Sequence, residues 1–183
     1  AQSRTVGRTL DGMSYTIPFY GNTTGRFGDF ESWRNNPHRG HDVAPVRGVT
    51  FPSWVNGKVG AVYRQSCLGL VVVVQNHADG YFIGVSHLDA NYVNVGDEVV
   101  IGTGLGAVGN SGTCTTGSHA HITVSPSSAR PESGTVVDPV LYANTASGGG
   151  GGIGYGMGLS SDAQLHAQRA LSHVGLYSGP HDG

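Results

Sequence analysis

Glycine, which occupies 31 of 183 positions, is the feature that most restricts what this chain can fold into. Each glycine inside a helix costs about 1 kcal/mol relative to alanine. Tight turns accept glycine readily, because it adopts backbone conformations that other residues avoid. Short valine-rich runs lie between the glycines, and the longest apolar run extends from Leu70 to Val74. The sequence therefore predicts a mostly β domain with an antiparallel sheet and many tight turns.

Turn residues divide the chain into a series of strand candidates. The pair Asp79-Gly80 stands where a hairpin turn is expected between two apolar runs. Three strands around it form an antiparallel meander, and further short runs bounded by Gly, Asn or Pro extend the sheet. An irregular lead-in over residues 1–36 is expected to pack on this sheet. The expected strands cover 57–64, 69–76, 81–88, 98–101, 106–109 and 120–125.

Five consecutive glycines at 148–152 predict a domain boundary. A chain of this length supports one main domain, which we expect at 1–146. Glycine-rich segments behave as flexible coil, so 147–153 is interpreted as a linker. Beyond it, Ser160-Ser161-Asp162 predicts the cap of a short amphipathic helix within a partial helical module at 154–183. One helix cannot form a stable core alone, so we expect this module to continue in a longer protein.

The charge pattern excludes some classes of partner. Formal net charge is −2, only 12% of residues are charged, and Lys and Arg form no run. Nothing resembles the basic surface that binds nucleic-acid phosphates, so we expect no nucleic-acid partner. No apolar run approaches the ~20 residues of a membrane span, so none is expected. We expect a monomer.

The two cysteines, Cys67 and Cys114, leave two possibilities open. They can form one disulfide in an oxidising compartment, or they can be two buried free thiols. Their spacing does not decide between these.

Histidine is concentrated in the middle of the chain. A catalytic zinc site usually has three protein ligands and one open position for water, and a carboxylate can complete a set of imidazoles. An extended or looped segment could bring His38 and Asp42 to one metal, while a strand would place His119 and His121 on one face. Alternatively, His38 and His41 are solvated loop residues and Asp42 caps a turn. Six histidines lie between positions 38 and 121: His38, His41, His77, His87, His119 and His121.

Ordered motifs from His38 to Val124 resemble the lysostaphin and LytM family of zinc metallopeptidases. The first is His38-x-Gly40-x-Asp42, which is similar to the H-x-G-x-D signature of that family. The second ends in the pair His87-Leu88. A turn-rich third block includes Gly106-x-Val108-Gly109-Asn110-Ser111-Gly112 and leads to His119-Ala120-His121, which resembles the H-x-H motif of the family.

This resemblance implies a role for each motif residue. It implies that His38, Asp42 and His121 bind Zn²⁺, with the motif core at 38–124 inside a metallopeptidase domain at 1–146. It implies that His87 and His119 are catalytic residues beside the metal-bound water. His41 and His77 are interpreted as structural or supporting residues. The implied fold is an antiparallel sheet with long loops around an open groove.

The resemblance also implies a substrate and a place of action. The substrate would be a peptidoglycan stem peptide or cross-bridge, hydrolysed outside the cell at the bacterial wall by a secreted or phage-delivered enzyme. Residues 154–183 resemble the opening of a peptidoglycan-binding repeat. The chain's own glycine run at 148–152 favours a cross-link other than polyglycine, because a polyglycine peptidase would find a substrate in its own linker.

Three other readings remain. The first is a non-catalytic member of the same fold that binds wall or activates a partner hydrolase. The second is a purely structural zinc domain, in which four protein ligands would be usual, with Cys114 close to His119. The third is a carbohydrate-binding β module, for which Trp33, Trp54 and the tyrosines are too dispersed.

Overall fold

The computed structural model describes residues 15–30 and 36–145, which form two antiparallel sheets with one short α-helix. The larger sheet has the strand order β1-β2-β10-β6-β5-β4-β8, and the smaller has the order β3-β9-β7. The elements are η1 (Tyr20–Asn22), β1 (Thr23–Gly25), β2 (His41–Val43), β3 (Thr50–Pro52), β4 (Gly57–Gln65), β5 (Gly69–Asn76), β6 (Phe82–Leu88), β7 (Ala90–Asn91), β8 (Glu98–Val99), β9 (Gly104–Ala107), β10 (Ala120–Ser125), η2 (Pro131–Ser133) and α1 (Pro139–Thr145). The expected mostly β, antiparallel class is confirmed.

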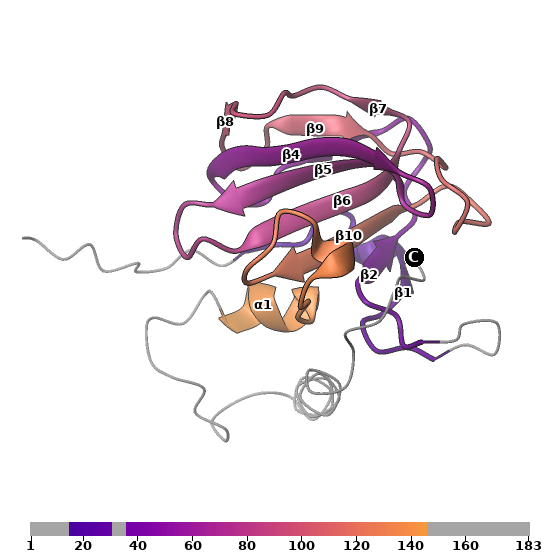
Figure 1. Cartoon of the computed structure of the whole chain (residues 1–183). Coiled ribbons are helices and arrows are strands. Elements are labelled where there is room, and N and C mark those ends of the chain that lie inside the picture. Colours follow the sequence, from indigo (N-terminus) through magenta and orange to yellow (C-terminus); the bar gives the residue numbers. More distant parts are fainter. Residues whose placement is uncertain (1–14, 31–35, 146–183) are drawn as a thin grey trace, which may run out of the picture.

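The predicted meander is present as β4, β5 and β6, which run side by side in Figure 1. Gly80 closes the β5–β6 turn with a φ of +78°, a backbone conformation that favours glycine. The strand predicted at 120–125 is β10. The expected strand at 106–109 lies two residues earlier, as β9, and the one at 98–101 is shorter, as β8.

Alternation along the strands separates two faces of the large sheet. Its inner face packs against the small sheet, with Ile122 of β10, Val72 of β5 and Phe51 of β3 in one apolar core. Its outer face carries a second, smaller cluster that includes Val71 and Val73. Because alternate side chains of a strand point to opposite faces, these two clusters fix which residues can meet on the outer face.

The lead-in and α1 are tied to the same end of the sheet. Tyr142 of α1 stacks on Tyr15 and on Tyr81, and the buried Asn76 amide donates to the hydroxyls of Tyr15 and Tyr142. Tyr142 in turn donates to Asp79 in the β5–β6 turn. Figure 1 shows α1 beside β10. The expectation that the lead-in packs on the sheet is confirmed for Tyr15, Ile17 and Phe19, which lie in or against the inner core, whereas Phe30 is exposed.

Cys67 and Cys114 form a disulfide, which decides the question that their spacing left open. The bond joins the β4–β5 turn to the segment before β10, across 47 residues of sequence. In the chain-entropy account, a loop of this length stabilises the folded state by about 4 kcal/mol.

The linker expected at 147–153 and the helical module expected at 154–183 lie outside the described residues. Among the described helices, none is long and apolar enough to cross a membrane.

Candidate metal centre

The pairing of β2 with β10 brings two distant motifs together. Asp42 lies directly opposite His121, and Val43 lies opposite Ala120. Val43 and Ala120 both belong to the inner core, so Asp42 and His121 must project from the outer face. A carboxylate and an imidazole separated by 79 residues thus meet because of strand register.

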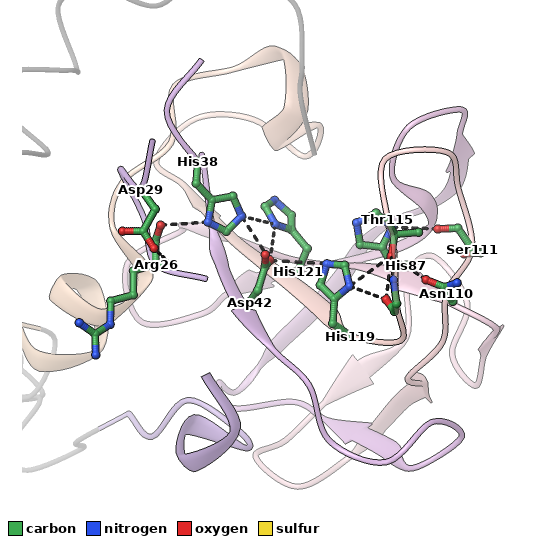
Figure 2. A network of polar contacts seen from close by, with 11 residues as sticks. Arg26, Asp29, His38, Asp42, His87, Asn110, Ser111, Thr115, His119 and His121 are labelled. Atoms are coloured by element: carbon green, nitrogen blue, oxygen red, sulfur yellow. Dashed lines mark hydrogen bonds and ion pairs between the residues drawn. The ribbon is translucent and has the colours of Figure 1, made fainter. Parts of the chain in front are cut away.

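Three atoms that carry lone pairs converge at this point, as Figure 2 shows. His121 Nδ1 lies 2.8 Å from Asp42 Oδ1, His38 Nε2 lies 3.2 Å from the same oxygen, and the two ring nitrogens are 3.0 Å apart. Such atoms crowd together only when something positive lies between them, either protons on the rings or a metal cation. Two imidazoles and one carboxylate match the three protein ligands that a catalytic zinc site usually has. The residues present therefore fit a metal, and all three are buried.

Electrostatics favours a cation over protons in this position. Burial lowers the pKa of His121, although Asp42 opposes the shift. Burial also disfavours the charged form of Asp42, but hydrogen bonds with His121 and His38 outweigh it and hold the Asp42 pKa well below its usual range. At neutral pH the site therefore combines the ionised carboxylate of Asp42 with a His121 imidazole that resists protonation, as metal binding requires.

His38 is oriented by the backbone of another segment. Its Nδ1 lies 2.9 Å from the carbonyl oxygen of Arg26, and a carbonyl can only accept, so Nδ1 carries the proton. In the neutral ring, Nε2 then keeps its lone pair and points at Asp42. Metal-bound histidines typically use their second nitrogen in this way.

The surroundings of Gly40 explain why the first motif has a glycine between His38 and Asp42. A Cβ at this position would lie 2.4 Å from the carbonyl oxygen of Ile122 and 2.5 Å from Cε1 of His121. Any side chain would therefore displace the strand that carries His121. The His38-x-Gly40-x-Asp42 spacing supplies two candidate metal ligands together with the space for the third, His121.

His87 reaches the site through an irregularity in β6. Leu70 pairs with Leu88 and Val72 pairs with Val85, so two residues of β6 face the single residue Val71 of β5. His87 is the extra residue of this bulge and has a φ of +63°, which is uncommon outside glycine. Its ring lies 6.1 Å from that of His121, between ring centroids. The bulge turns His87 toward the outer face.

The Nε2 atoms of His87 and His119, the two predicted catalytic histidines, point into the site. His87 Nδ1 donates to the Ser111 carbonyl at 2.8 Å, and His119 Nδ1 donates to the Gly117 carbonyl at 2.9 Å. Among the described residues, the buried Nε2 of His87 has no hydrogen-bond partner. His119 Nε2 lies 3.8 Å from Asp42 Oδ1, and its ring centroid is 4.6 Å from that of His87. Burial lowers the pKa of His87 to about 4, so the ring is neutral at pH 7.

The other two histidines of the region do not join this group. His41 projects away from the cluster, stacks on Tyr20 and contacts Thr23 Oγ1 at 2.9 Å. Exposed His77 pairs with Glu98 at 2.6 Å. The structure thus brings together all five residues predicted as ligands or catalytic groups and leaves His41 and His77 out.

A family model described as peptidase family M23 matches residues 36–139, more than half of the chain. The chain belongs to peptidase family M23. This confirms the lysostaphin and LytM resemblance of the main domain, whereas the resemblance of 154–183 to a wall-binding repeat stays a prediction. No curated protein sequence matches the chain.

Solved structures agree with the M23 assignment. LytU is 27% identical, with a TM-score of 0.58, over 66% of this chain and 83% of LytU. A zinc containing peptidase from Vibrio cholerae is 26% identical, with a TM-score of 0.54, over 62% of this chain and 37% of that one. The catalytic domain of the antimicrobial peptidase lysostaphin from Staphylococcus simulans is 20% identical, with a TM-score of 0.60, over 72% and 99%, and shows the fold alone.

Sequence reasoning did not find the groups that orient the M23 histidines. Three of them, at Arg26, Ser111 and Gly117, are backbone carbonyls, which have no signature in a sequence. A fourth is the hydroxyl of Thr115, which lies 3.3 Å from His119 Nδ1. The turn-rich stretch before the H-x-H motif indicated that this segment matters, but not what it binds.

Proposed function

We propose that this M23 domain is a zinc-dependent endopeptidase that hydrolyses peptide bonds of peptidoglycan. The observation that carries the proposal is the convergence of His38, Asp42 and His121, with His87 and His119 both presenting Nε2 to the same point. A merely structural site would be expected to use a fourth protein ligand. The zinc containing peptidase among the similar structures supports the choice of metal.

Each chemical task has a candidate residue. His38, Asp42 and His121 would hold the ion, which when bound supplies a Lewis acid and lowers the pKa of a water toward about 7. His87 and His119 have lone pairs at Nε2, so either can take a proton from the attacking water and return it to the leaving amine. Once protonated, the same nitrogen can donate to the oxyanion of the tetrahedral intermediate.

The exposure of the five residues indicates the direction of approach. The three proposed ligands are almost fully buried, as is His87, whereas the His119 side chain keeps 16% of its surface exposed. A substrate carbonyl can therefore reach the centre past His119. We infer an extended peptide as substrate, and the glycine run at 148–152 favours a bond other than glycyl-glycine.

We also propose the organisation of the whole chain. A catalytic domain at 1–146, joined by a linker at 147–153 to a wall-binding segment at 154–183, would raise the effective concentration of enzyme at an insoluble substrate. We further propose that the enzyme acts outside the cell, after secretion or release by a phage, and that it is a monomer.

The first experiment measures the release of amino groups and the loss of turbidity from purified walls with different cross-link chemistries. We expect release by the zinc-loaded chain, its loss with a chelator and its return when zinc is added. The newly exposed amino-terminal residue identifies the bond. Zinc-replete protein that binds walls and releases no amino groups would refute catalysis and favour the non-catalytic reading.

A further inference from the structure

One loop orients the two proposed catalytic histidines, His87 and His119. The segment from Gly109 to His119, called here the 109–119 loop, contributes the Ser111 carbonyl that accepts from His87. It also contributes the Gly117 carbonyl that accepts from His119. Among the described residues, no hydrogen bond joins this loop to the side chain of His38 or of His121, two of the three proposed ligands. The orientation of the catalytic pair and the assembly of the metal site therefore depend on different segments.

Ser111 is fixed from several sides. Its hydroxyl donates to the Leu88 carbonyl at 2.6 Å and accepts from the Leu70 amide at 3.0 Å. A Cβ on Gly69 would lie 2.2 Å from Ser111 Oγ, so the β4–β5 turn is packed against this residue. Ser111 therefore connects two neighbouring strands, and its carbonyl holds His87 at their bulge.

Thr115 organises the other end of the loop. Its hydroxyl lies 2.6 Å from Asn110 Oδ1, 2.8 Å from the Gly117 carbonyl and 3.3 Å from His119 Nδ1. Figure 2 shows Thr115 between Asn110 and the ring of His119. A single hydroxyl thus connects the part of the loop that holds His87 to the part that holds His119.

The disulfide anchors this loop between its two functional ends. Cys114 lies next to Thr115 and is bonded to Cys67 of the β4–β5 turn. The Cys114 amide also donates to the Cys67 carbonyl at 3.1 Å, and the Thr113 amide donates to the Ser66 carbonyl at 2.9 Å. The covalent bond therefore reinforces a short backbone pairing between the turn and the loop.

We propose that the Cys67–Cys114 disulfide, with Ser111 and Thr115, is a positioning device that keeps His87 and His119 as Nδ1–H tautomers with Nε2 directed at the reacting groups. The metal ligands do not need it, because they are held by the β2–β10 pairing and by the Arg26 carbonyl. The effect on turnover rests on the proposed function, whereas the tautomers can be observed without turnover.

The test compares the full chain with the double variant Cys67→Ala/Cys114→Ala. Long-range ¹H–¹⁵N correlation spectra of the imidazoles, with and without zinc, report the tautomer of each histidine. We expect Nδ1–H signals for His87 and His119 in the parent chain and mixed tautomers in the variant. Zinc affinity, measured by chelator competition, should change less than about twofold. Turnover of wall peptide should fall at least about tenfold, and at most by the roughly 10²–10⁴-fold that such a group contributes, with little change in KM.

Loss of the disulfide also lowers stability, so Thr115→Val is examined with the disulfide intact. Valine keeps the shape and removes the hydroxyl, and we expect a mixed His119 tautomer and reduced turnover with normal zinc affinity. Thr115→Ser keeps the hydroxyl and should therefore show the parent His119 tautomer and the parent turnover. Tyr142→Phe, which removes a hydroxyl far from the loop, controls for stability loss alone and should retain parent tautomers and turnover.

Unchanged tautomers in the double variant and in Thr115→Val would overturn the proposal. Reduced zinc affinity in Thr115→Val would also overturn it, because the loop would then support the metal site. If the parent chain cleaves no wall but the tautomers change as expected, the proposed function fails and the positioning device stands.

Discussion

Gly40→Ala is the sharpest test of how the metal centre is built. The new Cβ would lie 2.4 Å from the Ile122 carbonyl oxygen, about 1 Å short of the 3.4 Å at which ordinary contacts begin. The obstacle is backbone, so β10 must shift, and His121 shifts with it. Overpacking of this kind costs about 1–3 kcal/mol, which lowers the Tm by roughly 3–10 °C in a chain of this size. Displacement of a ligand by a neighbouring group typically weakens metal binding by about 10–100-fold.

The assay is chelator competition for zinc, together with thermal unfolding of the metal-free chain. Gly21→Ala is the matched control, because a Cβ there meets nothing within 4 Å and the residue does not have a positive φ. It should keep parent zinc affinity and be neutral or more stable by up to about 1 kcal/mol. Parent zinc affinity and parent Tm in Gly40→Ala would refute the argument that this glycine makes room for His121.

Three further predictions follow from the site. Asp42→Ala should abolish stoichiometric zinc binding. His119→Ala should retain zinc and lose about 10²–10⁴-fold in turnover. Metal analysis checks both variants, and loss of the metal in His119→Ala would refute the catalytic role of His119. Burial lowers the pKa values of His87 and His41 to about 4, below the value of about 6.5 in the unfolded chain. As the pH falls, the unfolded state therefore binds protons first, and the metal-free chain should lose stability between pH 6.5 and 4. Denaturant midpoints that stay constant over this range would contradict this prediction. Arg39→Lys should lower the Tm by a few degrees, because lysine cannot reproduce the hydrogen bonds of the guanidinium to two carbonyls of the 132–134 segment, and thermal unfolding would show it.

The family resemblance of a few ordered motifs was enough to predict much of the site. It implied His38, Asp42 and His121 as metal ligands, and the structure brings their ligand atoms within 4.8 Å of one another. The meander was predictable because Asp79-Gly80 is a local turn signal between long apolar runs. A local turn signal depends only on residues that are close in sequence, so the turn can be recognised without the structure.

Features that depend on pairing partners were not predictable. Strands β1, β2, β3 and β7 have only two or three residues each, so long-range partners rather than local propensity define them. The bulge at His87 exists because β6 has one more residue than β5 between two aligned pairs, a mismatch that only the register reveals. The short helix α1 was missed as well, because seven residues give little periodicity.

The position of β10 has a consequence for how the domain folds. This strand is the last of the sheet along the chain, yet it lies between β2 and β6. The consecutive strands β4, β5 and β6 can pair as soon as they are synthesised, since their contacts are local. The edge of β6 and the Asp42 segment must wait for residues 120–125 before either is covered. Zinc capture is therefore expected as a late folding event, simultaneous with insertion of the last strand, and a growing chain should have little affinity for the metal until that strand arrives.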